Sequence, residues 1–138
     1  MRTTRIGTRF WNLTLLLPLF ALASCSQAPA HTDHRPRHGG LVLMNGDLHF
    51  EVILNKEGRH RVYFSDAVRA ELPASIASEL TITITQYQKV SETLNARIDA
   101  DGKSWVADGK PVDDVNAVAR VAFAAQGRPY WIDLPFGF

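Results

Sequence analysis

Residues 41–54 read LVLMNGDLHFEVIL, a pattern typical of a β-hairpin. Asn45-Gly46 is the dipeptide that most favours a two-residue type I′ turn, because both central positions of that turn need a positive φ. Beyond the turn, apolar residues alternate with polar ones, as in a strand with one face in a core. We therefore expect residues 41–44 and 47–55 to pair as antiparallel strands.

Short apolar runs separated by turn residues continue along the rest of the chain. Residues 115–125 are rich in alanine and would also suit a helix, but the turn at residues 126–129 and the aromatic run after it favour a hairpin. Residues 73–79 are expected to form a connector with one helical turn. The further predicted strands are residues 60–65, 80–86, 94–98, 104–107, 115–125 and 130–134. This spacing predicts an all-β fold, an antiparallel immunoglobulin-like β-sandwich of about seven strands.

The N-terminus has the three parts of a secretory signal. Three arginines and no acidic residue precede an apolar run at residues 13–22, and the run ends in Leu22-Ala23-Ser24-Cys25. This tetrapeptide resembles the lipobox of bacterial lipoproteins, which are cleaved before the cysteine. The resemblance implies a signal peptide at residues 1–24 and a diacylglycerol on Cys25. The alternative is an ordinary signal that is cleaved after Ala28 or Ala30.

A lipid at Cys25 would place the protein on a membrane. The apolar run is about 10 residues long, whereas a spanning helix needs roughly 20. Ser26 follows the cysteine where an aspartate favours retention in the inner membrane. The resemblance therefore implies a lipid anchor in the outer membrane, with the protein facing the periplasm.

The predicted mature chain has a short tether and one domain. Residues 25–37 contain no large apolar side chain and are expected to form a solvated tether. Residues 38–138 are expected to form the β-sandwich domain. Removal of residues 1–24 takes away three arginines and changes the balance from 15 Lys+Arg against 14 Asp+Glu to 12 against 14. A chain with this balance has no basic patch, so we expect no nucleic acid as a partner.

Histidines gather in one part of the chain. The five are His31, His34, His38, His49 and His60. If Asn45-Gly46 is the turn, Met44 faces Asp47, Val42 faces His49 and Gly40 faces Glu51. Met44, His49 and Glu51 then share one face of the hairpin, the solvent side. His38 reaches this face only if the chain turns back at Gly39-Gly40, which paired glycines permit.

This face predicts a metal site made of His38, Met44, His49 and Glu51. Imidazole with carboxylate suits zinc, copper(II) or nickel, and a thioether would favour copper(I). The alternatives are a solvated polar face and a methionine that only packs. Whether the tether residues His31 and His34 take part stays open. His60, between two arginines, is expected to be a surface residue.

Residues 38–52 read HGGLVLMNGDLHFEV. They resemble the His-Gly-Gly…Gly-Asp-x-His-x-Glu run of small bacterial periplasmic proteins associated with heavy-metal efflux or resistance. The run RVYFSDAVR at residues 61–69 is similar to them too, so the resemblance covers residues 38–69. It implies metal handling with a metal-efflux system as partner, and metal contacts at His38, His49 and Glu51.

Signs of catalysis are few. The sequence has no Gly-x-Ser-x-Gly elbow, no phosphate-binding loop and, with Cys25 acylated, no free thiol. We therefore expect no enzyme, but a lipid-anchored periplasmic metal-binding protein of the copper or zinc class. Its role would be that of a buffer, a chaperone or an accessory in metal homeostasis or efflux.

The alternative is a non-metal interaction or structural module of the envelope. Its surface would use the aromatic C-terminus, which comprises Tyr130, Trp131, Phe136 and Phe138, although such residues more often close the core.

Overall fold

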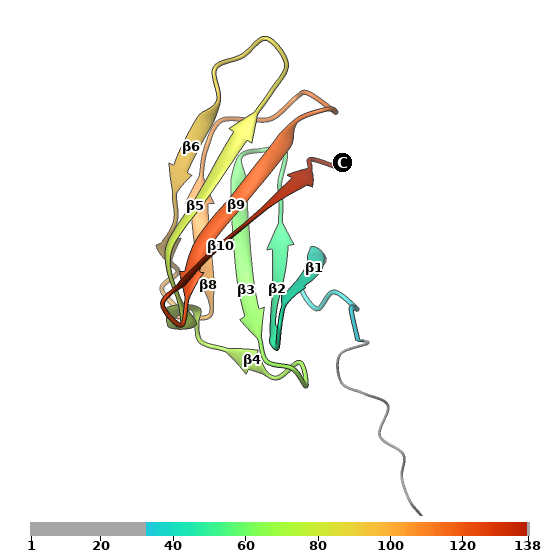
Figure 1. Ribbon diagram of the computed structural model, residues 1–138. Coiled ribbons are helices and arrows are strands. Elements are labelled where there is room, and N and C mark those ends of the chain that lie inside the picture. The colour runs from blue at the N-terminus through green and yellow to red at the C-terminus, as the bar shows by residue number, and fades with distance from the viewer. Residues whose placement is uncertain (1–32, 138) are drawn as a thin grey trace, which may run out of the picture.

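Two antiparallel sheets packed face to face make up residues 33–137, the part of the chain that the computed structural model describes (Figure 1). The first sheet, sheet A, has the strand order β1-β2-β3-β8-β7, and β4 also pairs with β3. Its strands are β1 (Leu41–Asn45), β2 (Leu48–Ile53), β3 (Arg59–Ser65), β4 (Glu71–Leu72), β7 (Arg97–Ile98) and β8 (Ser104–Asp108). The second sheet, sheet B, has the order β10-β9-β5-β6. Its strands are β5 (Ala77–Thr85), β6 (Glu92–Asn95), β9 (Val118–Ala125) and β10 (Arg128–Pro135).

The predicted antiparallel β-sandwich is confirmed. Within the described range it has ten strands rather than about seven. One reason is that the predicted strand at residues 94–98 is divided between the two sheets, with β6 ending at Asn95 and β7 beginning at Arg97. The other is the two-residue strand β4, which the sequence does not signal. The predicted helical turn in the connector is present as a 3₁₀ turn, Ala74–Ile76.

The core lies between the two sheets and is rich in aromatic rings. Phe50 of β2 stands edge-on to Phe123 of β9 and to Tyr130 of β10, with ring centroids 5.3 and 5.4 Å apart. Phe64 of β3 meets Phe123 in the same way at 5.2 Å. Each such pair contributes about 0.5–1.5 kcal/mol beyond the area it buries. Because side chains alternate along a strand, every second residue of β2 and β3 points the other way, to the outer face of sheet A.

The predicted β1–β2 hairpin forms, but in a different register. Asn45 pairs with Leu48, so the loop is Gly46-Asp47 and the predicted turn at Asn45-Gly46 is wrong. Of the loop residues, only Gly46 has a positive φ, 60°, which is what a type II′ turn requires at its first position. Met44 therefore pairs with His49. A shift of two residues leaves each side chain on its predicted face, whereas a shift of one would have reversed them all.

Residues 33–40, which we call the strap, do not continue β1 along the sheet but fold back over the outer face of sheet A. The turn needs both glycines. Gly39 has a φ of 82°, and a Cβ at Gly40 would lie 2.5 Å from the carbonyl oxygen of Val52. Residues 35 and 37, in the segment predicted as tether, are already hydrogen-bonded to side chains of the sandwich. The predicted signal peptide, Cys25, His31 and Phe138 lie outside the described residues.

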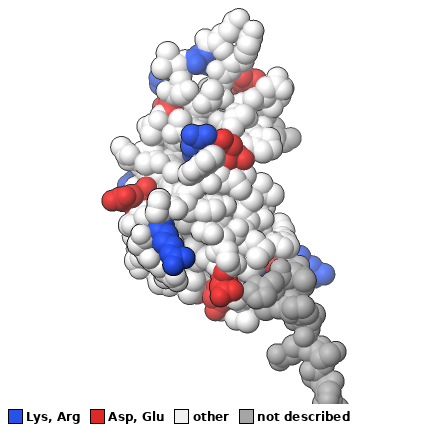
Figure 2. Space-filling view, in the orientation of Figure 1, with Lys and Arg blue, Asp and Glu red and all other residues white. Residues whose placement is uncertain are grey.

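In residues 33–137, no helix has the length and apolar character needed to cross a membrane. Positive and negative side chains are interspersed on the face of the molecule drawn in Figure 2. The pairs include Arg120 with Asp133, which joins β9 to β10 across the surface of sheet B.

Candidate metal site

His49 and Glu51 share the outer face of sheet A, on the opposite side of β2 from the core residues Phe50 and Val52. The predicted common face is therefore present, but its predicted exposure is wrong. His49 is 0% exposed and Glu51 is 3% exposed. The reason is that the strap and the loop after β3 cover this face. Neither segment belongs to the hairpin, so the hairpin geometry alone did not predict the burial.

Glu51 uses its carboxylate to hold the strap. Oε2 accepts the backbone N–H of Arg37, and Oε1 accepts those of His38 and Gly40, each at 2.8 Å. Burial by itself raises the pKa of Glu51, but the hydrogen bonds from Gly40, Arg37 and His38 outweigh it and bring the pKa below its ordinary value. The predicted metal contact Glu51 is therefore ionised, and most of its acceptor capacity is directed at backbone N–H groups.

Arg69 is a second buried charge on this face, and the sequence analysis did not single it out. It is 3% exposed and has a φ of 66°. Its Nη1 donates to Ser65 Oγ at 3.2 Å, and its Nη2 donates to the carbonyl oxygen of Arg35 in the strap at 2.9 Å. Glu51 and Arg69 thus hold neighbouring parts of the strap, and both line one small cavity between strap and sheet.

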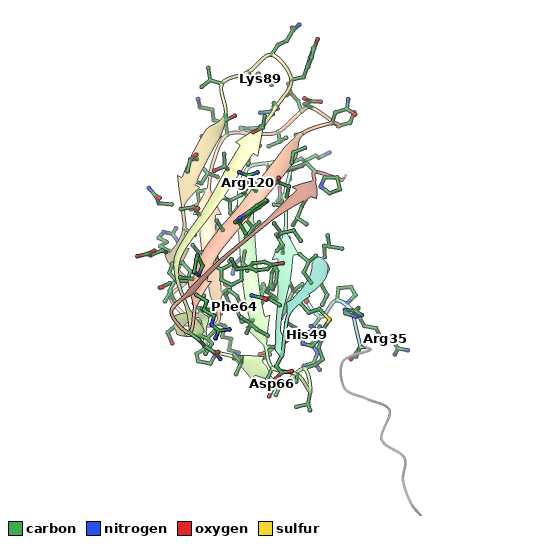
Figure 3. The ribbon with its side chains drawn as sticks, in the orientation of Figure 1. Arg35, His49, Phe64, Asp66, Lys89 and Arg120 are labelled. Carbon is green, nitrogen blue, oxygen red and sulfur yellow. The ribbon has the colours of Figure 1, made fainter. Side chains whose placement is uncertain are left out.

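The loop that carries Arg69 also sets the orientation of His49. The Asp66 carboxylate accepts the N–H groups of Val68 and Ala70 at 3.0 and 2.8 Å, which shapes the loop. The carbonyl oxygen of Asp66 lies 3.1 Å from His49 Nδ1, and Figure 3 shows the two residues at the same end of the sheet. A carbonyl oxygen can only accept, so Nδ1 carries the hydrogen in this contact.

In the neutral imidazole of His49 the lone pair is therefore on Nε2. Among residues 33–137, Nε2 has no hydrogen-bond partner, although it is buried. Histidines that ligate metals commonly donate their other ring N–H to a carbonyl oxygen, which orients the ring and makes the ligating nitrogen more basic. His49 has this arrangement within the fold itself.

Two further side chains lie beside His49. Met44 is its partner in the β1–β2 ladder and is 38% exposed. The exposed His34 of the strap has its ring centroid 6.0 Å from that of His49, at an interplanar angle of 51°. The structure thus places His34, which the sequence analysis left open, next to the predicted residues Met44 and His49. Spacing along the chain could not show this, since it depends on the fold of the strap.

The imidazole of His38 makes contacts of a different kind. Its backbone N–H reaches Glu51, as the expected turn at Gly39-Gly40 allows. Its ring stacks on Tyr63 of β3, with centroids 3.7 Å apart and planes within 6°. His38 Nε2 lies 3.5 Å from Glu71 Oε1. His38 is therefore on the predicted face, but its ring is directed to β3 and β4 rather than to the lone pair of His49. Across residues 33–137, no three or more His, Cys, Asp or Glu side chains are grouped so that they could hold a metal ion.

His60 is not a surface residue, so that prediction is wrong. It is 0% exposed and points into the sandwich, where its ring stands edge-on to Phe136 at 5.7 Å. Its Nδ1 accepts the backbone N–H of Asn55 at 3.2 Å. Burial lowers the pKa of His60 against the opposing effect of nearby carboxylates. The missed signal was parity, because His60 alternates with the core residues Val62 and Phe64.

No protein-family model, curated protein or solved structure matches the chain. The similarity of residues 38–69 to periplasmic proteins of metal resistance therefore stays a prediction. The functional argument rests on the geometry around His49.

Proposed function

We infer that this protein is a lipid-anchored metal-binding protein of the bacterial cell envelope. In this proposal Cys25 carries the lipid, the domain faces the periplasm from the outer membrane, and the ion belongs to the copper or zinc class. The protein would serve as a buffer, a chaperone or an accessory of a metal-efflux system.

One observation carries the metal part of the proposal. The buried ring of His49 is held by a hydrogen bond from Nδ1 to the Asp66 carbonyl oxygen, and its Nε2 lone pair is unused within the described residues. A buried polar atom without a partner costs about 1–3 kcal/mol. A metal ion bound to Nε2 would remove this cost, and this supports metal binding at His49.

The other predicted residues have distinct parts in this proposal. Met44 pairs with His49 in the β1–β2 ladder, and the ring centroid of His34 lies 6.0 Å from that of His49. Glu51 supports the site by fixing the strap that covers it. His38 with Glu71 is a second imidazole–carboxylate pair on the same face, partly exposed and 3.5 Å apart, which could contact an ion at its own place.

Metal titration of the full-length chain in detergent tests the proposal. The wild-type protein should bind zinc or copper with a Kd well below about 0.1 mM, which corresponds to more than roughly 5 kcal/mol. His49→Ala should abolish this binding. His49→Gln is the matched variant, since its amide can still donate to Asp66 and fill the site, but it is a poor ligand.

Near-ultraviolet circular dichroism of both variants shows whether the sandwich is intact. Binding that is weaker than about 0.1 mM, or that is equally tight in a folded His49→Gln variant, would contradict the proposal.

The lipid anchor is tested separately. Cells that express the full-length chain should incorporate labelled fatty acid into it, and the protein should sediment with outer membranes. Cys25→Ser should lose both the label and the membrane association, because several acyl chains are what hold such a protein on a bilayer. Membrane association that survives Cys25→Ser would contradict the anchor while leaving the metal site untouched.

One observation supports a second function, that of an interaction module without a metal. Trp131 on the edge strand β10 is 60% exposed, and the Arg120 guanidinium lies 4.5 Å from the centroid of its ring. The neighbouring Phe136 is buried and Tyr130 packs on the core, as such aromatic residues more often do. An envelope partner that is retained with a chelator present, and in His49→Gln, but lost in Trp131→Ala would favour this function.

A further inference from the structure

The residues beside His49 also indicate which kind of ion the site takes. They come from three segments that the fold brings together: His49 from β2, Met44 from β1 and His34 from the strap. His49 is fully buried, whereas His34 and Met44 are exposed.

The distance between the two imidazoles fits a shared ion. A metal–nitrogen bond of about 2.0–2.1 Å and a ring radius of about 1.1 Å place each ring centroid about 3.2 Å from a bound ion. Two imidazoles on one ion can thus have centroids up to about 6.4 Å apart. The centroids of His34 and His49 are 6.0 Å apart, which is within this limit.

The third neighbour is a thioether. Met44 is the direct cross-strand partner of His49, and side chains that are paired in this way lie about 4.5–5.5 Å apart at Cβ. Thioether sulfur is a soft donor that selects copper(I) over zinc, whereas imidazole accepts either ion. An apolar packing role would favour burial of Met44, yet it is 38% exposed on the face that carries the two imidazoles.

The charge of the three donor side chains also favours copper(I). Two imidazoles and a thioether bring no negative charge to the ion. The two buried charges near them, Glu51 and Arg69, have opposite signs and are each engaged with the strap. The cost of moving an ion out of water grows with the square of its charge, so a divalent ion would need about four times the compensation of a monovalent one. A neutral donor set therefore suits a monovalent ion.

We propose that His34, His49 and Met44 form a site for copper(I). This rests on the proposed function and specifies its ion. Arg69 is a positioning residue: its Nη2 binds the carbonyl oxygen of Arg35, the residue after His34, and so holds the strap where His34 meets His49.

Competition for copper(I) tests the assignment. The full-length chain in detergent is titrated without oxygen with copper(I) in complex with bicinchoninate, and separately with zinc. The wild-type protein should take one copper(I) from the chelator. Met44→Leu, which conserves volume at an exposed position, and His34→Gln should each weaken copper(I) binding at least about tenfold, the lower end of the loss seen when even a supporting group of a metal site is removed.

His38→Gln removes the other strap imidazole and leaves His34 in place, so it distinguishes the two candidate ligands of the strap. It should change copper(I) affinity less than about threefold. Met44→Leu should leave zinc affinity nearly unchanged, because zinc does not select thioether sulfur. X-ray absorption of the copper-loaded wild type should show a sulfur neighbour that is missing in Met44→Leu.

The outcomes separate the two proposals. Binding that depends on His49 but not on His34 or Met44 would overturn the copper(I) site and leave the proposed function standing. The same holds if His38→Gln, and not His34→Gln, weakens copper(I). Zinc binding tighter than copper(I) would also overturn it. If neither ion binds with a Kd below about 0.1 mM, both proposals are wrong.

Discussion

His49 and His60 are both fully buried on sheet A, but they lie on opposite faces and use their ring nitrogens in opposite ways. His60 is in the core, where Nδ1 accepts a backbone N–H, so its lone pair is used inside the fold and it is the Nε2–H that has no partner in residues 33–137. His49 is on the outer face, where Nδ1 donates and the lone pair on Nε2 has no partner in residues 33–137. Burial by itself therefore does not show whether the lone pair of a histidine is used inside the fold. The direction of the hydrogen bond at Nδ1 does.

The inner and outer faces of sheet A are also covered by different kinds of contact. The inner face is closed by sheet B and by aromatic packing, which needs no polar contact. The outer face is closed by the strap, which depends on the buried charges of Glu51 and Arg69. We expect substitutions on the inner face to affect stability most, and substitutions on the outer face to affect the strap and the proposed metal binding.

Phe50→Ala should have the largest effect on stability. Phe50 is 0% exposed and meets three aromatic rings of the core. Its loss leaves a cavity and should lower the free energy of unfolding by about 3–5 kcal/mol, as measured by urea denaturation. The folded fraction should still bind metal with the wild-type Kd. A loss below about 1 kcal/mol would mean that the two sheets do not pack through this ring.

Glu51→Gln, one residue along the same strand, should cost less. The amide keeps the shape, but loses the charge and one acceptor oxygen for the three strap N–H groups, so we expect a loss of about 2–3 kcal/mol. Hydrogen exchange at Arg37, His38 and Gly40 should become faster, and metal affinity should fall with the loosened strap. Glu57→Gln, at an exposed turn, is the control that should change none of these. Unaltered exchange in Glu51→Gln would show that the strap is held by other contacts.

Acid should weaken the two faces in separate pH ranges. Burial lowers the pKa of His60, so its contribution to stability is complete above its ordinary value of 6.5 and is lost as the pH falls through the lower folded value. The strap hydrogen bonds, against burial, lower the pKa of Glu51, so its contribution is complete above 4.5 and is lost at more acid pH. Urea titrations from about pH 3 to about pH 8 should show a flatter upper range in His60→Leu and a flatter lower range in Glu51→Gln. Unchanged slopes in both variants would contradict these assignments.

Tyr63→Leu should have the smallest effect. It removes the ring on which His38 stacks and leaves the Glu51 hydrogen bonds in place, so the free energy of unfolding should fall by about 1 kcal/mol. Tyr87→Leu, which replaces a tyrosine that is 78% exposed, is the matched control. A large loss of copper(I) binding in Tyr63→Leu would indicate that His38, rather than the proposed His34, contacts the ion.

Local patterns in the sequence were enough to predict the β-sandwich fold. Alternation of apolar residues and the glycine at position 46 predict the hairpin, and period-two runs predict the other long strands, because these signals act between residues that are near in the chain. The shared face of Met44, His49 and Glu51 follows from the same alternation. It survived the error in register because the error was an even number of residues.

Tertiary contacts determined the arrangement of the candidate metal site. The return of the strap over sheet A depends on a carboxylate at position 51 and a guanidinium at position 69, which no local pattern connects with residues 35–40. This return buries His49 and Glu51, turns Glu51 toward backbone N–H groups and carries His34 to His49. Such contacts join residues that are far apart in sequence, so their geometry exists only when the whole domain is folded.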